Sequence, residues 1–506
     1  MKQSIYLTLL VLMVVTIACE QPTTKEVVQE PTSQNTYHNP VFPGDHPDPS
    51  IMREGDDFYA VHSSFEYYPG LLIWHSTDLL NWEPVTNALH EYVGSVWAPD
   101  ITKYEDKYYI YFPANNKNYV VTADNIAGPW TDPVELDITM IDPGHVVDEE
   151  GNRFLFFSSG SYVPLTKDGL SLAGDVKHVY DGWKIPREWS IECFCMEGPK
   201  LFKRGEYYYL TVAEGGTAGP ATGHMVISAR SKSLDGPWEN SPHNPILRTQ
   251  SPEEDWWSVG HGTVFDDADD NWWMMFHGYE RDYYNMGRQT MLIPVEWTED
   301  DWYKIPDNVD FNEPIPYPRD AKQNTSHTFT DAFDQETLKL QWKLFGGDDK
   351  ERYRMDNGLV MKGKGSSVFA TAPLLFIPKD HSYSVQVEMT MEKDAIGGLM
   401  LFYNNNAFSG IMADDKNILA NLRGWQFATE KDVTEGHVFL KLTNNQHHVD
   451  MHYSLDGINW TKIENSFEAS GYHHNILSGF MSLRIGLVAL GDGEVTFNNF
   501  QYESLD

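Results

Sequence analysis

The stretch DPSIMREGDDFYAV, residues 48–61, contains the unit from which we predict the fold. A proline-flanked acid, Asp48, precedes a short strand-forming segment, and a Gly-Asp-Asp turn leads into a second segment that begins at Phe58. Two aromatic and β-branched segments joined by a tight acidic turn are typical of a β-hairpin. The same pattern returns along the chain, so this hairpin indicates the architecture of a whole domain.

The hairpin occurs five times. Its second strands begin at Phe58, Tyr108, Phe154, Tyr207 and Trp272, with spacings of 50, 46, 53 and 65 residues. Segments such as STDLLNWEPV and SKSLDGPWENSP follow some of the hairpins and resemble outer strands marked by a tryptophan. A four-stranded unit that recurs about every 50 residues is typical of a β-propeller. We therefore predict five blades over residues 38–318.

A second domain is expected because 506 residues exceed the roughly 250–300 that one core usually serves. Residues 319–327 form a polar linker, and residues 328–506 contain alternating strands such as YSVQVEMTME. These strands predict an antiparallel β-sandwich, so the chain is all-β, a five-bladed propeller followed by a jelly roll. Trp342, Trp425 and Trp460 are too scattered to define a sugar-binding face, and a bracing role is slightly favoured.

The charge balance restricts the partners. Lys and Arg total 37 against 74 Asp and Glu, which gives a formal net charge of −37. Phosphate backbones and anionic lipid surfaces are repelled by such a chain, so no nucleic-acid partner is expected.

The N-terminus predicts export. Residues 1–19 combine a lysine, a short apolar run and small residues that end at Cys19, and they resemble a bacterial lipoprotein signal. Residues 20–37 form a polar tether. We expect an envelope protein held to the outer membrane only by a lipid on Cys19, facing the periplasm or the cell surface. Thr16 departs from the usual aliphatic residue, so plain secretion stays open.

Five polar residues stand at the starts of the first strands of the blades: Asp48, Asp100, Asp142, Glu197 and His261. The first strand of each blade lines the propeller axis, so these side chains should meet at one mouth of the channel. Any one of them alone could cap a strand or bind turn amides. Crowded carboxylates repel each other, which makes a catalytic site the better interpretation of the set. Separated carboxylates among aromatic rings suit hydrolysis of a glycosidic bond.

The motifs HPDPS, VWAPDI, IDPGH, MEGPK and GRQT, in this order over residues 38 to about 300, resemble glycoside hydrolase family 43. That family contains β-xylosidases and α-L-arabinofuranosidases, and it is an inverting, five-bladed propeller family. The segments YSLDGINW and FNNFQYE resemble the concanavalin-like domain that is appended to some members.

The resemblance implies three catalytic roles. Asp48 matches the general base that deprotonates the attacking water, and Glu197 matches the general acid. Asp142 matches the carboxylate that orients the acid and raises its pKa, which agrees with the repulsion expected between two close carboxylates. Glu192 is an odd number of residues from Glu197 and would point to the opposite strand face, so it is a poorer acid.

The resemblance also implies the sugar contacts. Arg288 matches an arginine that binds sugar hydroxyls, Phe65 and Trp97 match an aromatic wall, and Asp100 and His261 complete the expected substrate-binding set. No cofactor is expected to be required. Calcium stays an option, bound indirectly at His261, and no direct metal ligands are predicted.

The expected activity is that of an exo-acting inverting β-xylosidase, which releases terminal xylose from oligosaccharides of a xylose-containing plant or algal polysaccharide. An α-L-arabinofuranosidase or a bifunctional enzyme is the nearest alternative. A non-catalytic carbohydrate-binding lipoprotein is a more remote one.

Cys193 and Cys195 are two residues apart. In a strand their side chains would point to opposite faces, so a disulfide between them is not expected. The sequence has no zinc-type spacing, and structural thiols are predicted.

Overall fold

The computed structural model describes residues 35–347, 350–432 and 435–506. The signal segment, Cys19 and its lipidation lie outside these residues, as does nearly all of the tether. Within the described ranges, no helix has both the length and the apolar character needed to cross a membrane.

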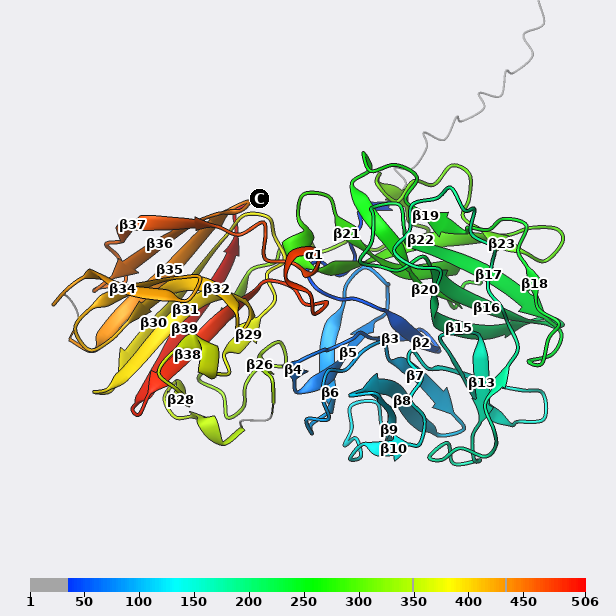
Figure 1. The fold of residues 1–506 in the computed structure, drawn as a ribbon, viewed down its shortest axis with the longest axis horizontal. Helices are drawn as coiled ribbons and strands as arrows, with labels where there is room; N and C mark the ends of the chain where they lie inside the picture. Colours follow the sequence, from blue (N-terminus) through cyan, green and yellow to red (C-terminus); the bar gives the residue numbers. More distant parts are fainter. Residues whose placement is uncertain (1–34, 348–349, 433–434) are drawn as a thin grey trace, which may run out of the picture.

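The N-terminal domain is the predicted five-bladed propeller, on the right in Figure 1. Each of its five sheets is antiparallel, and its strands are neighbours in the order of the sequence. The first blade comprises β2 (Ser50–Glu54), β3 (Asp57–Val61), β5 (Gly70–Ser76) and β6 (Glu83–Leu89). The second comprises β7 (Asp100–Tyr104), β8 (Lys107–Ala114), β9 (Lys117–Ala123) and β10 (Val134–Leu136). The third comprises β11 (Gly144–Val147), β12 (Arg153–Phe157), β13 (Ser161–Pro164) and β14 (Lys177–His178).

The last two blades hold the longest propeller strands. The fourth comprises β15 (Met196–Arg204), β16 (Tyr207–Glu214), β17 (Met225–Ser231), β18 (Glu239–Asn240) and β19 (Leu247–Arg248), which pairs with β17. The fifth comprises β20 (Trp256–Asp266), β21 (Trp272–Glu280), β22 (Arg288–Trp297) and β23 (Tyr303–Lys304), with η1 (Tyr284–Met286) between β21 and β22. Each of the five predicted marker residues therefore lies in the second strand of a blade, which confirms the repeat.

The start of the propeller domain pairs both with its last blade and with a strand near its end. Val41 and Phe42 donate their backbone N–H groups to the carbonyl of Thr290 in β22 at 3.0 Å, which joins the start of the domain to its last blade. β1 (Thr36–Tyr37) pairs with β24 (Ile315–Pro316). Buried aromatic rings fill the space between blades, as where Phe58 meets Phe265 with ring centroids 6.0 Å apart. Such ring contacts stabilise the blade interfaces beyond their buried area.

The C-terminal domain is the predicted sandwich of two antiparallel sheets, on the left in Figure 1. One sheet contains β25 (Phe329–Asp331), β27 (Tyr353–Met355), β28 (Leu359–Lys362), β30 (Tyr383–Met391), β35 (His437–Asn445), β36 (His448–Ser454), β37 (Thr461–Glu468) and β39 (Glu494–Ser504). The other contains β26 (Lys343–Phe345), β29 (Leu374–Phe376), β31 (Ala395–Asn404), β32 (Ala407–Ala413), β33 (Ile418–Leu422), β34 (Trp425–Glu430) and β38 (Arg484–Gly491). The short helices are η2 (Lys350–Arg352), η3 (Val368–Ala370) and α1 (His474–Leu477).

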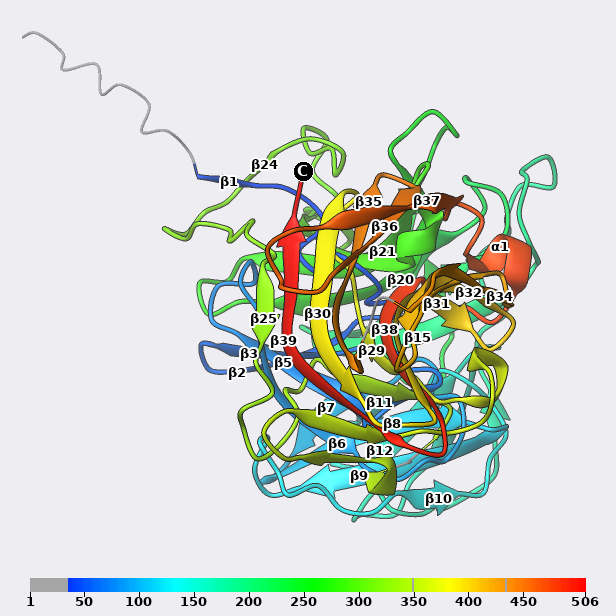
Figure 2. The ribbon, with the colours of Figure 1, turned by 90° about the vertical axis from the view of Figure 1, so that its left-hand side faces the viewer.

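The two domains share a sheet. β4 (Tyr67–Tyr68) belongs to the first blade in sequence but pairs with β26 and so extends the second sheet of the sandwich. The loop that carries α1 lies between the domains in Figure 1, and Figure 2 looks onto the sandwich with the propeller behind it. The sandwich therefore lies against the propeller and is not merely tethered to it.

The structure bears on two further sequence expectations, of which the first is contradicted and the second agrees. The expectation of free thiols was wrong, because Cys193 and Cys195 form a disulfide. They lie in the loop before β15, where the strand geometry assumed for them does not apply, and their Cα atoms are 5.3 Å apart. Trp342 is buried in the sandwich core, whereas Trp425 is 80% exposed, so these tryptophans form no common face.

Candidate active site

Asp48 and Asp142 lie just before the inner strands β2 and β11, whereas His261 lies within β20 and not at its start as the sequence predicted. Asp48, Asp142 and His261 have φ angles of 58°, 56° and 53°, in the left-handed region that side chains other than glycine rarely adopt. Backbone strain of this kind concentrates at functional sites, where the surrounding structure must enforce it. All three side chains are almost fully buried and line one pocket.

Asp48 is held by donors on both of its oxygens. Arg288 donates from Nη1 to Oδ1 at 2.7 Å, and Ser63 donates from Oγ to Oδ2 at 2.5 Å. Burial by itself would raise the pKa of Asp48, but the charges of Arg288 and His261 together with His277 hold that pKa well below its usual range. Asp48 is therefore an ionised carboxylate at neutral pH, as a general base must be.

Glu197 has the opposite electrostatic character. Burial, followed by the charges of Asp142 and Asp48, raises the pKa of Glu197 to about 8. Its side chain remains 24% exposed toward the pocket, with Oε1 3.6 Å from Nε2 of the buried His224. A carboxyl group that keeps its proton at neutral pH and still reaches the pocket can act as a general acid.

Asp142 lies between these two extremes. Burial and the charge of Asp48 raise the pKa of Asp142 to about 6, against the donors that stabilise its ionised form. Those donors are Ser158 Oγ at 3.1 Å and the backbone N–H of Gly198 at 3.0 Å. Gly198 follows Glu197 directly with φ of 60°, and a Cβ at this position would lie 2.6 Å from Nε2 of His261. Only glycine fits there, so the turn after Glu197 binds Asp142 through the backbone.

The pocket has a volume of about 60 Å³ and is walled by aromatic rings and one cation. Phe65 and Trp97 come from the propeller, and the guanidinium of Arg288 lies 5.6 Å from the Phe65 ring centroid. Phe480, from the sandwich, forms the facing wall, 5.5 Å from the same guanidinium. The site is thus built by both domains, and Phe480 has no counterpart among the residues predicted from the sequence.

Asp100 is a correction to the expected set, because it does not line this pocket. Its carboxylate accepts hydrogen bonds from Lys200 Nζ at 2.7 Å, Ser50 Oγ at 3.1 Å and the backbone N–H of His145 at 2.8 Å. These three groups come from the fourth, first and third blades and satisfy the buried carboxylate. Asp100 therefore joins blades at the channel and does not contact the pocket.

Family comparison agrees with this geometry. The profile described as "Glycosyl hydrolases family 43" matches residues 37–303, and the one described as "Beta xylosidase C-terminal Concanavalin A-like domain" matches residues 330–503. The chain belongs to glycosyl hydrolase family 43. As a member of that family it is a glycosidase, and the ionised Asp48 and protonated Glu197 are its candidate base and acid.

Relatives of this family 43 chain differ in specificity. It is 28% identical to a non-reducing end α-L-arabinofuranosidase of Bacteroides ovatus, over 94% of this chain and 95% of that one. It is also 28% identical to a xylan 1,3-β-xylosidase of a Vibrio species, over 85% and 90% of the two chains. A xylan β-1,4-xylosidase structure from Bacillus halodurans superposes with a TM-score of 0.81 at 25% identity, over 92% of this chain and 99% of that one.

Two histidines that the sequence did not single out complete the family 43 site. His277 in β21 accepts the backbone N–H of Asp48 on Nδ1 at 3.0 Å, and its Nε2 is 3.2 Å from Thr217 Oγ1. His224 precedes β17 and packs parallel to His277 with ring centroids 5.5 Å apart. A histidine within the apolar strand WWMMFHGY was the available signal for His277. Its position beneath Asp48 depends on the packing of two blades.

Asp48, His261 and His277 could together hold a metal ion, since their ligand atoms lie within 4.8 Å of one another. Calcium, the ion considered from the sequence, prefers six to eight oxygen ligands, and this set supplies only one carboxylate. The Arg288 guanidinium occupies Asp48 Oδ1, and the Nδ1 lone pair of His277 accepts the Asp48 N–H. These three groups therefore do not fit direct calcium binding, and nothing in the chemistry below passes through a metal.

Proposed function

We propose that this family 43 enzyme is an exo-acting, inverting β-xylosidase that removes terminal xylose from oligosaccharides of a xylose-containing polysaccharide. The observation that carries the proposal is a pair of opposite pKa shifts in one small pocket. The pKa of Asp48 is lowered, and the pKa of Glu197 is raised to about 8. One ionised and one protonated carboxyl group are what acid–base hydrolysis of a glycoside requires.

The reaction follows from these protonation states. Glu197 gives its proton to the glycosidic oxygen as the bond to the anomeric carbon breaks, and the aglycone leaves as an alcohol. Asp48 takes a proton from a water molecule whose oxygen forms the new bond to the anomeric carbon on the opposite face. The products are the free sugar with inverted configuration and the shortened oligosaccharide, and proton exchange with solvent restores both carboxyl groups.

The pocket supports exo action on a small terminal sugar. It has a volume of about 60 Å³ and is lined by Arg288 and by the rings of Phe65 and Phe480. A ring without an exocyclic carbon suits such a space, and Arg288 offers donors to its hydroxyls. Terminal α-L-arabinofuranose is the second candidate, because one of the most similar relatives bears that activity in its name.

Activity on nitrophenyl β-xyloside, nitrophenyl α-L-arabinofuranoside and natural oligosaccharides tests the proposal. We expect turnover of the xyloside, release of single xylose units from chain ends, and an α-anomer as the first product in proton NMR spectra. An initial β-anomer would refute inversion. Absence of turnover on every substrate would favour the non-catalytic carbohydrate-binding lipoprotein.

Full activity after exhaustive treatment with EDTA is expected, because no step passes through a metal.

Glu197→Gln is the first variant to test. The amide keeps the shape of the side chain but has no proton to give, so kcat on natural oligosaccharides should fall by roughly 10²–10⁴. Substrates with a nitrophenol leaving group need less protonation and should lose much less. Glu188→Gln, at an exposed position in the loop before the acid, is the matched control and should stay near wild type. Near-wild-type turnover of Glu197→Gln on natural substrates would refute the assignment.

Export and lipid attachment are part of the proposal. They are supported by the residues around Cys19, which combine an apolar run, small residues and cysteine before a polar tether. Mass spectrometry of the mature N-terminus from cell envelopes should find a lipidated Cys19, and Cys19→Ala should release the enzyme from the membrane fraction. An unmodified N-terminus beyond Cys19 would favour plain secretion.

A further inference from the structure

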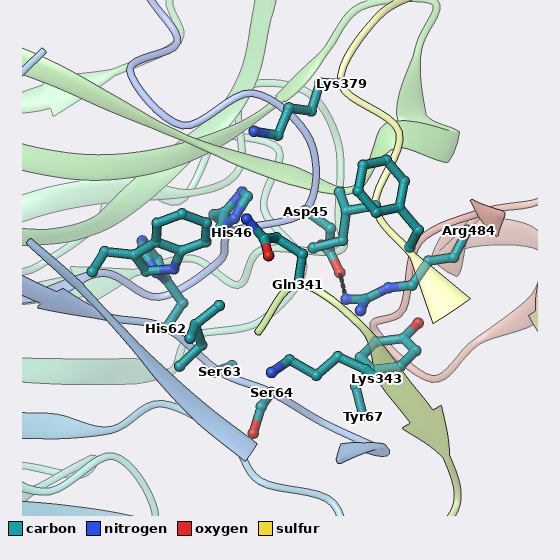
Figure 3. Close-up of a pocket in the computed structure, with 14 residues that line it drawn as sticks. Asp45, His46, His62, Ser63, Ser64, Tyr67, Gln341, Lys343, Lys379 and Arg484 are labelled. Atoms are coloured by element: carbon teal, nitrogen blue, oxygen red, sulfur yellow. Dashed lines mark hydrogen bonds and ion pairs between the residues drawn. The ribbon is translucent and has the colours of Figure 1, made fainter. Parts of the chain in front are cut away.

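A second cavity, of about 70 Å³, lies where the two domains meet (Figure 3). Asp45, His46, His62 and Ser63 reach it from the propeller side, and Lys343, Lys379 and Arg484 reach it from the sandwich. It shares no lining residue with the active-site pocket. The cavity is therefore a separate feature of the domain junction.

The charges around this cavity do not balance. Lys343, Lys379 and Arg484 bring three cationic groups, and Asp45 is the one carboxylate among the described residues that line it. Asp45 is already paired with Arg484, Nη2 to Oδ2 at 3.1 Å, as Figure 3 shows. Lys343 reaches only neutral oxygens, those of Asn87 Oδ1 and the Leu340 carbonyl. Burial and the charge of Arg484 lower the pKa of Lys343 to about 7, which shows that its ammonium form lacks a counter-charge here.

Several buried polar atoms at the cavity also lack a protein partner. Both ring nitrogens of His62, the hydroxyl of Tyr67 and Nε of Arg484 form no hydrogen bond within the described ranges. These three residues are between 1% and 5% exposed. Buried polar groups are nearly always paired, so such a cluster indicates an occupant that is not part of the chain.

We propose that this junction cavity binds one small monovalent anion of halide type, held between Lys343 and Arg484. A water-sized occupant needs roughly 10–15 Å³, so chloride or bromide fits with space for water beside it. Water alone would pair the polar atoms but would leave a charged Lys343 without a counter-ion. The apolar walls supplied by Leu72, Trp74 and Phe376 disfavour a more strongly hydrated divalent anion.

The anion links the two domains next to the catalytic base. Lys343 precedes Leu344, whose backbone pairs with Tyr68 of β4, so the ammonium sits at the shared sheet. Ser63 lines the cavity and donates to Asp48. An ion bound between Lys343 and the propeller wall should therefore stabilise the docked sandwich, and the thermal unfolding temperature of the whole chain reports this.

Two measurements on the mature full-length protein test the site. The unfolding temperature should be roughly 2–4 °C higher in sodium chloride than in sodium gluconate at equal ionic strength. Crystals soaked in bromide should show an anomalous peak between the side chains of Lys343 and Arg484. Equal unfolding temperatures in the two salts, or bromide found only on the outer surface, would overturn the proposal.

Variants separate the site from general salt effects. Lys343→Met should abolish the difference between chloride and gluconate, whereas Lys416→Met, at an exposed position of the sandwich, should keep it. If Lys343→Met does not fold, the bromide map of the wild-type protein decides the question. A chloride effect that survives in a folded Lys343→Met protein would refute the assignment of the ligands.

Discussion

Asp48 and Asp142 are the same residue type in one pocket, yet their pKa values shift in opposite directions because their neighbours differ. Asp48 faces a guanidinium at 2.7 Å, and that charge outweighs the effect of burial. Asp142 accepts hydrogen bonds from neutral donors among the described residues, and burial together with the charge of Asp48 raises its pKa to about 6. Burial, followed by the repulsion of both aspartates, gives Glu197 the highest pKa of the three, about 8.

These shifts predict a bell-shaped dependence of kcat/KM on pH. The enzyme is active with Asp48 ionised and Glu197 protonated, so activity should fall above about pH 8 as Glu197 loses its proton. Asp142→Asn removes one charge that repels the ionised form of Glu197. The pH at which kcat/KM falls on the alkaline side should therefore decrease by about one unit. Burial still raises the pKa of Glu197 in this variant, so the midpoint of the alkaline fall should stay above the ordinary glutamate pKa.

The measurement is the pH profile of kcat/KM on a natural oligosaccharide. Asp175→Asn, at an exposed position of the propeller, is the control and should leave both limbs in place. An unchanged basic limb in Asp142→Asn would mean that Asp142 does not set the pKa of the acid.

At the scale of elements, the propeller was predictable because its information is local. A tight turn and two adjacent strand segments determine each hairpin, and five such hairpins recur in the sequence. The loop after α1 is different. It places Phe480 against Arg288 and Trp97, although it lies in the other domain and has no repeat or motif of its own. Side chains brought to a site by domain docking leave no local signal.

Phe480→Ala should weaken the sugar subsite. The ring packs 3.9 Å, centroid to centroid, from His474 and walls the pocket opposite Phe65. Its loss should reduce kcat/KM about tenfold, mainly through a higher KM, because one stacking wall is removed while the carboxyl groups remain. Steady-state kinetics on xylose and arabinose substrates checks this. Phe369→Ala, at a 47% exposed position elsewhere in the sandwich, is the control. Equal kinetics of the two variants would refute the role of Phe480 as a wall of the sugar subsite.

At the scale of the whole molecule, ion pairs and rings also join the domains. His381 of the sandwich lies 2.9 Å from Glu280 of the propeller and stacks on Tyr283 with ring centroids 3.6 Å apart. Burial would lower the pKa of His381, but the hydrogen bond and charge of Glu280 outweigh it and raise that pKa. A histidine with a raised folded-state pKa stabilises the protein below its unfolded pKa, and this contribution is lost as the pH rises through the folded value.

His381→Gln should therefore destabilise the protein in a pH-dependent way. We expect a loss of roughly 0.5–1 kcal/mol at about pH 6, where His381 is charged, and a smaller loss in alkaline buffer. Denaturant unfolding at both pH values measures the difference. His38→Gln, at an exposed position where the described hydrogen bonds involve only the backbone of the histidine, should show neither loss. A loss that is the same at both pH values would argue against the charged pair.

The sequence by itself determined the propeller, the sandwich, and the placing of Asp48, Asp142 and Glu197 next to the starts of inner strands, whereas His261 lies within β20. These features depend on turns, strand periodicity and repeats, which are contained in short segments. Only the tertiary structure decided which of the five aligned polar residues face the pocket, since Asp100 is bound by groups from three other blades. It also decided the disulfide, the place of His277 beneath Asp48 and the wall supplied by Phe480. Each of these depends on distances between segments far apart in the chain, and such distances are set by packing.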